Sequence, residues 1–453
     1  MSMQISVKPE VSYLTELLTQ CRPSEPVQAN WLVELSDRPL QMLRDRTAAI
    51  VQELAIPTRR DEEWRFTDLS PLLEVKFQGV SAVETPQFDI EPLILPEAAE
   101  SRLVFVNGIY APHLSAVSGL PEGIFVGNLA ALPLKYHQTI WNYLAQQQGA
   151  SEVFTALNTA GLTDAAVVWA SKNQLIEQPI HLLFISTTNH APVICQPRCL
   201  VVAEAGSQLT LIEHYAANVE GCADIPVNHP YLTNQVTEIW VEENAAVNHT
   251  RNQREAANGF HMGKTAVTQG SNSQYTGTAI SLGAKLSRHN WEIFQKGEGT
   301  QTILNGLTMI SGAQLADTHS TVALNHPNGT SNQLHKCIVD DRAHGVFNGK
   351  VFVPQAAQFT NASQLNRNLL LSSKARVDTK PQLEITADQV KCSHGATVSQ
   401  LDPEEVFYLQ SRGLKEPDAR SLLIDAFVAE ILNRVPIASL RQRLFQCATC
   451  RTA

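Results

Sequence analysis

The feature that most constrains the fold is a stretch of about 230 residues, beginning near Ala165, in which short apolar segments alternate with turn residues. The segments are rich in Val, Ile, Leu and aromatic residues, and Gly, Asn, Asp and Ser separate them, as is typical of strands. They read AAVVWAS, PIHLLFIST, RCLVVAEAG, QLTLIEHYA, TEIWVEE and KVFVPQ. Because no convincing amphipathic helix interrupts this stretch, we predict a mainly β core.

A turn phrase recurs within this stretch, at residues 205, 244, 283, 312, 356 and 374. Each copy joins small residues to a polar residue and then an apolar one, as in AGSQLTL and GAQLADT. This pattern is expected where a corner leads into a stacked strand. The spacing is too irregular for a consensus repeat, but a β-helix tolerates loops between its turns. Since paired Asn-Gly hairpin signals are sparse, a right-handed parallel β-helix over residues 161–398 is favoured over a β-sandwich.

The region before the core, residues 1–160, is predicted to be mainly helical. The segment RPLQMLRDRTAAIVQELAIP has apolar spacing typical of a helix that Pro57 closes. The segment ALPLKYHQTIWNYLAQQQGASEVFTALNTAG supplies a second helical stretch. The stripe of the first helix consists of Leu40, Leu43, Thr47, Ile50, Val51 and Leu54.

The region after the core, residues 399–453, is also predicted to be helical. Asp402 can cap a helix that has Pro403 in its first turn and Glu405 reaching back, and Gly413 ends it. Pro417 opens a second helix, and ASLRQRLFQ forms a third. These helices either pack on the core or present a surface to a partner. The predicted apolar stripe of the second helix is Ala419, Leu422, Leu423, Ala426, Phe427 and Ile431.

Charge and segment composition restrict the partners and the compartment. A net charge of −10 argues against nucleic acid or anionic lipid as a partner. The start of the chain lacks a basic segment followed by an apolar one, and no apolar run approaches the length of a membrane span. The eight cysteines are scattered rather than framed in a short domain. We therefore expect a soluble protein with reduced thiols and no membrane partner.

Two metal-ligating residue types stand two positions apart in KCSH, at Cys392 and His394. If this segment is a strand, both side chains point to the same face, with Cα atoms roughly 6.5 to 7 Å apart. Thiolate and imidazole suit zinc, copper or iron–sulfur chemistry, but such centres take about three or four ligands. The pair is thus half of a site. The alternative is that Cys392 is a small buried residue and His394 a hydrogen-bonded turn residue.

Other candidate motifs are weaker. His335 and Cys337 have the same spacing, but core packing is favoured for them. Cys447 and Cys450 form a single CxxC pair without a second pair, which is weak evidence for zinc or redox chemistry. No GxxxxGK[ST] segment occurs, so the chain lacks a phosphate-binding loop of that kind.

Two C-terminal segments resemble the SufD subunits of the SUF iron–sulfur cluster assembly machinery, in the SufB/SufD family. They are ADQVKCSHGATVSQLDPEEVFYLQSRGL and DARSLLIDAFVAEIL. DEEWRFTDLSPLL, LVFVNGIYAPHLS, GVFNGKVFV and NLLLSSKARVDTKPQLEI fit the same family, so the resemblance covers nearly the whole chain. SufB proteins look similar but carry a cysteine and a glutamate where this chain has Asn366 and Gly395. These departures indicate the SufD side of the family.

The resemblance implies a non-catalytic subunit of an iron–sulfur scaffold complex. Its expected partners are a SufB-like paralogue and a SufC-like ABC-type ATPase, which would supply the ATPase activity. Cys392 and His394 match family positions that contribute a half-site for iron or a nascent cluster at the SufB interface. The chain alone is expected to hold no stable cofactor, and iron or a cluster would be bound only transiently in the complex.

The resemblance also implies that the C-terminal helices hold the ATPase. Phe407, Tyr408, Arg412 and Phe427 are the expected contacts, because aromatic residues and arginine are enriched at interface hot spots. The cytoplasm, or the plastid stroma of an organelle, is the expected compartment, and the isolated chain is a candidate homodimer.

The residues by themselves leave two other functions open. One is a purely structural SufB-holding subunit in which His394 is incidental. The other is an enzyme built on a β-helix, such as a polysaccharide lyase or an acyltransferase. A lyase would usually be exported and would line a groove with carboxylates and bases, and no export signal is seen.

Overall fold

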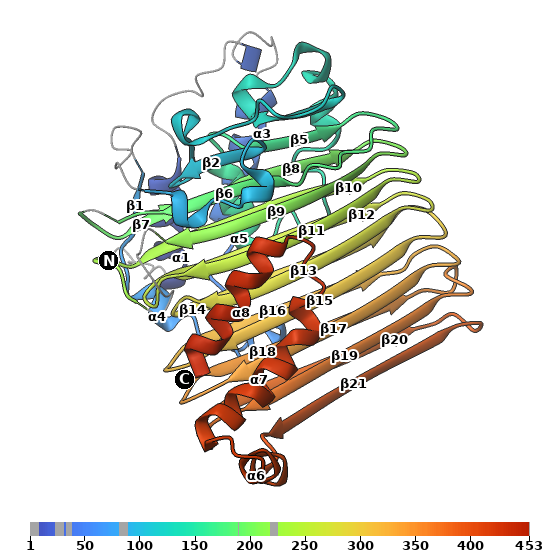
Figure 1. Ribbon diagram of the computed structural model, residues 1–453. Coiled ribbons are helices and arrows are strands. Elements are labelled where there is room, and N and C mark those ends of the chain that lie inside the picture. Colours follow the sequence, from blue (N-terminus) through green and yellow to red (C-terminus); the bar gives the residue numbers. More distant parts are fainter. Residues whose placement is uncertain are drawn as a thin grey trace, which may run out of the picture.

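The protein is described here from a computed structural model that covers residues 9–22, 31–32, 39–80, 89–188, 190–217 and 225–452. Two long sheets face each other, and from residue 231 onward the chain alternates between them, adding one strand to each per turn (Figure 1). This is a β-helix of about eight turns. In the part of the chain so described, no helix is long and apolar enough to cross a membrane.

The first sheet, sheet A, contains β1 (Gln78–Gly79), β4 (Ile124–Asn128), β5 (Ala166–Ala170), β7 (Val193–Cys195), β8 (Arg198–Ala203), β10 (Tyr231–Val241), β12 (Phe260–Gln269), β14 (Leu286–Gln295), β16 (Leu315–Ala323), β18 (His344–Val353) and β20 (Arg376–Ile385). The second sheet, sheet B, contains β2 (Arg102–Val106), β3 (Ile109–Tyr110), β6 (Ile180–Ser186), β9 (Gln208–Ala217), β11 (Ala246–Glu255), β13 (Gln274–Gly283), β15 (Gln301–Ile310), β17 (Thr330–Val339), β19 (Asn361–Leu370) and β21 (Lys391–Gln400). The predicted strand segments all lie on strands of these two sheets.

The stacked turns are in continuous parallel register, so equivalent residues form columns along the β-helix. In sheet B, for example, Gln333 is the Cα partner of Gln364, and Gln364 is the Cα partner of His394. Because side chains alternate along a strand, each column points either between the sheets or away from them. A column therefore keeps its face from one turn to the next.

The recurring turn phrase marks corners between the two sheets, in both directions, and at the corners from sheet A to sheet B the backbone passes through a left-handed residue. Asn244 and Asn272 adopt left-handed backbone conformations, with φ of 58° and 56°, and glycine stands at the same corner in other turns. Their backbone N–H groups donate to Ser271 and Glu298 carbonyls of the following turn, at 2.9 and 2.8 Å. Asparagine and glycine tolerate this conformation better than other residues. The predicted turn phrases lead directly into β9, β11, β14, β16, β19 and β20.

The N-terminal helices cover the outer face of sheet A. They are α1 (Pro9–Cys21), α3 (Pro39–Glu53), α4 (Ser70–Leu73) and α5 (Val153–Ala160). Apolar side chains of this region pack on Leu232, Phe260 and Leu286 of the sheet. The predicted helix around residue 45 is confirmed as α3. The second predicted stretch is not one continuous α-helix. It consists of short 3-10 helices at Leu129–Ala131, Leu134–Tyr136 and Thr139–Asn142, followed by α5.

The C-terminal helices α6 (Pro403–Ser411), α7 (Glu416–Leu432) and α8 (Ala438–Thr452) follow β21. Asp402 caps α6 as predicted, because its side chain accepts a hydrogen bond from the backbone N–H of Glu404. Figure 1 shows α7 and α8 lying across sheet B, and apolar residues of both helices pack on Leu307, Leu334 and Ile338.

The predicted apolar stripe of α7 is wrong in part. Leu422 is 49% exposed and Ala426 is also exposed. The buried side chains of this helix are Ala419, Ile424, Val428, Ile431 and Leu432. Apolar residues occur on every side of α7, so its spacing alone could not select the stripe that meets the sheet.

The fold class is the predicted one, mainly β, with a right-handed parallel β-helix core and helical regions at both ends. Strands also occur before residue 161, since β2 pairs with β6 and β4 pairs with β5. The boundaries at residues 161 and 398 stay predictions.

Candidate functional site

The last turn of the β-helix differs from the others because its strands form the open edges of both sheets. Within the described part of the chain, β20 pairs only with β18, and β21 pairs only with β19. All residues of β21 are exposed except Cys392 and Gly395, which are half-buried. Among the described residues, the backbone edge of β21 therefore remains available for pairing with another chain.

Cys392 and His394 both lie on β21 and point to the inner side of the β-helix, so the prediction that they share a face is confirmed. Cys392 packs against the interior apolar cluster beside Ala362, and burial raises the pKa of its thiol. The thiol is thus protonated at neutral pH in the free chain. His394 is exposed at the open end. No group of three or more metal-ligating side chains occurs in the described parts of the chain.

Two buried amides stand behind His394 in the same inward column, and the sequence reasoning missed them. Gln364 donates from Nε2 to the Oε1 atom of Gln333 at 2.9 Å, and the Nε2 atom of Gln333 donates to Ser320 at 2.8 Å. The spacing of 31 and then 30 residues could have pointed to this column. It becomes meaningful only once the register of the turns is known.

The middle turns enclose ionisable side chains between the sheets. His249 lies 3.3 Å from the Oε2 atom of Glu213, and His261 lies 2.8 Å from the Oε2 atom of Glu255. Arg251 lies between these pairs and hydrogen-bonds His261. Burial alone would raise the pKa of Glu213, but His249 holds it below its usual value. All of these groups are buried, so the cluster has no access for a substrate.

Inward glycines make room for the large polar side chains. A Cβ atom at Gly306 would come within 1.9 Å of the His335 ring, and one at Gly277 within 2.1 Å of Trp291. His335 accordingly lies over Gly306, stacks on Phe347 and contacts the Thr308 hydroxyl at 3.1 Å. Such close approach requires glycine.

The second cysteine–histidine pair is part of the core, as favoured from the sequence. His335 is buried inside the β-helix, and Cys337 packs there with Val339. Leu334 and Ile338 point the other way, toward α7.

The predicted ATPase contacts fall into two groups. Phe407 and Tyr408 on α6 are 71% and 57% exposed, and Arg412 lies 5.3 Å from the Tyr408 ring centre and donates to its hydroxyl. Figure 1 shows α6 beyond β21, at the open end of the β-helix. Phe427 instead packs beside the apolar cluster under α7, with the Lys336 ammonium 4.4 Å from its ring centre. Phe427 is thus part of the helix–sheet contact rather than of the exposed surface on α6.

The motif DEEWRFTDLS binds the N-terminal region to the outer face of sheet A. Arg288 lies 3.8 Å from the Trp64 ring centre and donates to the Glu63 carbonyl and to the Asp317 carboxylate. His319 lies between Asp317 and Glu63, at 3.0 and 3.1 Å. Glu63, Asp317 and His319 form one side of a groove of about 360 Å³ that is also lined by Arg59, Arg60, Arg65 and Lys380. We call the contacts of Glu63, Trp64, Arg288, Asp317 and His319 the N-terminal latch.

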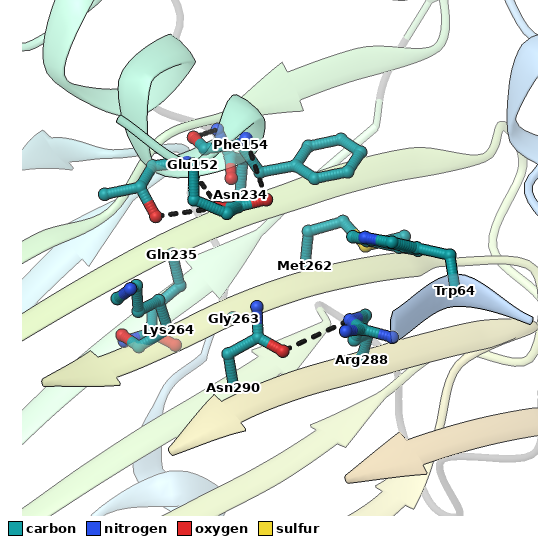
Figure 2. Close-up of a pocket in the computed structure, with 11 residues that line it drawn as sticks. Trp64, Glu152, Phe154, Asn234, Gln235, Met262, Gly263, Lys264, Arg288 and Asn290 are labelled. Atoms are coloured by element: carbon teal, nitrogen blue, oxygen red, sulfur yellow. Dashed lines mark hydrogen bonds between the residues drawn. The ribbon is translucent and has the colours of Figure 1, made fainter. Parts of the chain in front are cut away.

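A smaller pocket lies beside the latch, between Trp64, Phe154, Met262 and Arg288 (Figure 2). It encloses about 10 Å³, which is the space of one water molecule. The pocket is therefore a packing gap between the N-terminal region and sheet A, and it cannot hold a substrate.

The CxxC pair lies on α8, where Cys447 is buried against the helix–sheet cluster. The side chain of Cys450 lies outside the described residues, as does Cys222. The zinc or redox role of the pair stays a prediction.

Comparisons with known proteins agree with the resemblance found in the sequence. Residues 184–427 match the family model described as the SufBD core domain of SUF system FeS cluster assembly, and residues 27–182 match the SufBD protein N-terminal region. An iron–sulfur cluster assembly SufBD family protein of Synechocystis is 53% identical over 90% of this chain and 90% of its own length. The chloroplastic protein ABCI7 of Arabidopsis thaliana is 33% identical over 98% of this chain and 92% of its own length. The iron–sulfur cluster assembly protein SufD of Escherichia coli is 31% identical over 86% of this chain and 88% of its own length.

Proposed function

The chain belongs to the SufBD family of the SUF iron–sulfur cluster assembly system, and we propose that it is a non-catalytic scaffold subunit that shares one cluster-assembly site with a SufB-like paralogue. The observation that carries this proposal is the place of Cys392 and His394. They face inward on the strand that ends the β-helix, where the chain leaves the sheet edges open.

The open edges of β20 and β21 support pairing with a paralogue of the same fold. An exposed strand edge presents unpaired N–H and C=O groups that another strand can satisfy. A partner whose own β-helix ends in the same way would pair with both edges at once. A second copy of this chain could pair there too, which is how a homodimer of the isolated chain would form.

Pairing at these edges would complete the half-site. His394 can offer a neutral imidazole nitrogen to iron or relay a proton when sulfide is delivered. Cys392 must first lose the proton that its raised pKa retains, so we assign it the lesser part. The remaining ligands would come from the paralogue, and iron or the nascent cluster is the cargo of this site.

The exposed surface of Phe407, Tyr408 and Arg412 on α6 is the proposed contact for a SufC-like ATPase. Tyr408 and Arg412 already hold each other in place, so little side-chain freedom is lost on binding. The ATPase activity would reside in that partner. The relatives include a bacterial protein and a chloroplastic one, so the cytoplasm or the plastid stroma is the proposed compartment.

The test of the shared site compares His394→Ala with His113→Ala. His113 is also exposed but lies in the Pro112–Leu114 turn, outside β20 and β21. Each variant is co-purified anaerobically with the SufB-like and SufC-like proteins of the same source, and iron and sulfide per complex are measured. We expect His394→Ala to lose the load while the complex and the melting temperature of the free chain stay unchanged. A normal load in His394→Ala would mean that the subunit is purely structural.

The test of the ATPase contact uses substitutions on α6 and keeps the helices in place. Removing everything after Gln400 would expose the sheet face that α7 and α8 cover, so loss of binding would be ambiguous. We expect Phe407→Ala with Tyr408→Ala to weaken co-purification of the ATPase at least tenfold. Leu422→Ala serves as the matched control, because Leu422 is also exposed and apolar but lies on α7. Equal ATPase binding by the double variant and the control would exclude this surface.

A further inference from the structure

The inward column that ends at His394 contains a second residue whose chemistry is directed at the histidine. Gln333, Gln364 and His394 are successive Cα partners on β17, β19 and β21. Neighbouring strands are separated by about 4.8 Å, so side chains in one column are within hydrogen-bonding reach of each other. The first step of the column shows this directly, because Gln364 donates to Gln333 at 2.9 Å.

In the structure, the Gln364 amide turns its donor side toward Gln333, whose Oε1 atom also accepts from the Ser320 hydroxyl at 3.2 Å. Gln333 donates its own Nε2 hydrogen to Ser320 and accepts from Gln364 with its Oε1 atom. Because the Gln333 oxygen accepts, the neighbouring amide must donate to it with its NH₂ group. Gln364 Nε2 therefore points back along the column, toward Gln333. Its Oε1 atom must then point elsewhere.

That Oε1 atom is buried and has no hydrogen-bond partner among the described residues. The opposite strand offers none, because the amide lies against Gly349, where a Cβ atom would come within 2.8 Å of Oε1. The next residue in register with Gly349 is Pro381, which has no polar side chain. A buried acceptor left unpaired costs about 1 to 3 kcal/mol, so a donor is expected.

We propose that Gln364 is the positioning residue of His394, with its Oε1 atom accepting a hydrogen bond from one ring nitrogen of the histidine. His394 is the next side chain in the column and points to the same face. His394 is exposed in the structure, and the proposed bond requires its ring to turn inward onto the amide. The bond selects one neutral tautomer, as outer hydrogen bonds do for histidines that bind metals.

The role of this hydrogen bond in cluster assembly rests on the proposed function. The placement of Gln364 beside His394 does not, because it follows from the register of β19 and β21. With one nitrogen bonded to Gln364, the other carries the free lone pair and faces out of the open end. An incoming iron ion or an acidic proton would meet that nitrogen. Gln364 itself would not touch the cargo.

The experiment measures the tautomer of His394 directly. The chain is labelled with ¹⁵N-histidine, the His394 signals are identified by their loss in His394→Ala, and the ring ¹⁵N shifts are recorded at a pH where the ring is neutral. We expect wild type to favour one tautomer, and Gln364→Met to move the ratio about fivefold toward that of free imidazole, the effect of one hydrogen bond. Gln364→Glu retains an acceptor and should restore the preference.

The matched control is Asn368→Leu. Asn368 lies on the same strand, is buried and also has an unpaired side-chain oxygen, but its Cα partner on β21 is Val398. Its loss should cost a similar amount of stability and leave the His394 shifts unchanged. Circular dichroism confirms that each variant is folded before it is compared.

The outcomes separate this inference from the proposed function. Unchanged His394 shifts in Gln364→Met, or equal changes in Asn368→Leu, would overturn the positioning role whatever the complex does. In the complex with the paralogue, Gln364→Met should lower iron and sulfide loading and Gln364→Glu should recover it. If the tautomer responds to Gln364 but His394→Ala still loads normally, the bond exists and the proposed site of assembly is wrong.

Discussion

The middle turns of the β-helix and its last turn are built in the same way but differ in what surrounds them. β10 is buried along its whole length, whereas β21 is exposed at most positions, although each is a parallel strand paired in continuous register. β10 has a strand on either side and the N-terminal helices over its outer face, whereas β21 has one neighbour. Local structure is therefore the same, and only the position in the stack decides whether a side chain is enclosed.

The histidines illustrate the consequence. His335 and His394 both point inward from strands of sheet B, on β17 and β21. His335 is enclosed, stacks on Phe347 and bonds Thr308, whereas His394 stands at the open end. An enclosed histidine is tied to stability, and an open one is available for chemistry. Four predictions test this contrast.

The largest effect is expected where a charge is enclosed. Arg251→Met removes the cation that lies near Glu213 and Glu255, so their charges remain buried without it. Arg251 acts on both carboxylates as a neighbouring charge, and its loss should cost about as much as breaking a buried ion pair, roughly 3 to 5 kcal/mol. The free energy of unfolding, measured by chemical denaturation, should fall by that amount. Lys391→Met on exposed β21 should change it by less than about 0.5 kcal/mol. Equal losses in the two variants would contradict the contrast between the regions.

A smaller effect is expected when the enclosed histidine is removed. His335→Ala should lower the free energy of unfolding by roughly 2 to 3 kcal/mol, because it leaves a cavity over Gly306. His394→Ala should lower it by less than about 0.5 kcal/mol. Gly306→Ala alone should also destabilise the chain, since its Cβ would strike the His335 ring. The double variant should lose less than the sum of the two losses, and simple additivity would exclude the contact.

Part of the pH dependence of stability should come from the enclosed histidine His335. Burial lowers the pKa of His335 from 6.5 to about 4. The unfolded chain therefore takes up a proton below about pH 6.5 that the folded chain does not, so stability falls as the pH drops from there toward 4. The loss should reach up to about 3 kcal/mol, at about 1.4 kcal/mol per pKa unit.

Denaturation curves between pH 7 and 4.5 check this expectation. His335→Gln should reduce the slope by the share of one proton, because His181, His214, His261 and His289 are also buried with lowered pKa values and keep their own shares. His394→Gln should leave the slope as it is. A slope in His335→Gln as steep as that of wild type would assign the pH dependence to the other groups alone.

The smallest effect is expected at the N-terminal latch, which lies on the outer face. Burial alone would lower the pKa of His319, but Asp317 and Glu63 raise it above its usual value. The latch is thus at full strength below about pH 6.5, and its contribution is lost as the pH rises through the raised pKa. Because Glu63 is exposed, we expect less than about 1 kcal/mol.

Trypsin reports on the latch because Arg59, Arg60 and Arg65 lie beside it. His319→Gln should be cleaved faster than wild type at pH 6.5 and at a similar rate at pH 9. Faster cleavage at both values would mean that the substitution disturbs the fold and that protonation is not the cause.

The fold was predictable to a large extent, for identifiable reasons. Short apolar segments and the turn phrase indicated strands and corners, because those patterns follow from side-chain alternation and from backbone conformations that Asn and Gly tolerate. The N-cap of α6 was predictable because it is local: Asp402 accepts a hydrogen bond from the backbone N–H of Glu404, two residues away. The stripe of α7 was not readable, because Leu422 and Ile424 are equally apolar and only the sheet decides between them.

Of the candidate site, only the pair Cys392 and His394 was predictable from the sequence. Cys392 and His394 are two residues apart, so strand geometry alone places them on one face. Gln364 stands 30 residues earlier and joins them only through the register of β19 and β21. Phe427 could not be placed from the sequence, because an aromatic residue on a helix suits an exposed contact and a packed one equally well, and it lies beside the helix–sheet cluster.

By itself, then, the sequence determined the local geometry: which segments are extended, where the chain turns, and that a thiol and an imidazole share one face of the strand Lys391–Gln400. These properties depend on residues a few positions apart. Only the tertiary structure decided which strands end the stack, and hence that His335 is enclosed while His394 is open. Burial depends on what covers a strand, and in this chain the covering residues come from tens to hundreds of positions away.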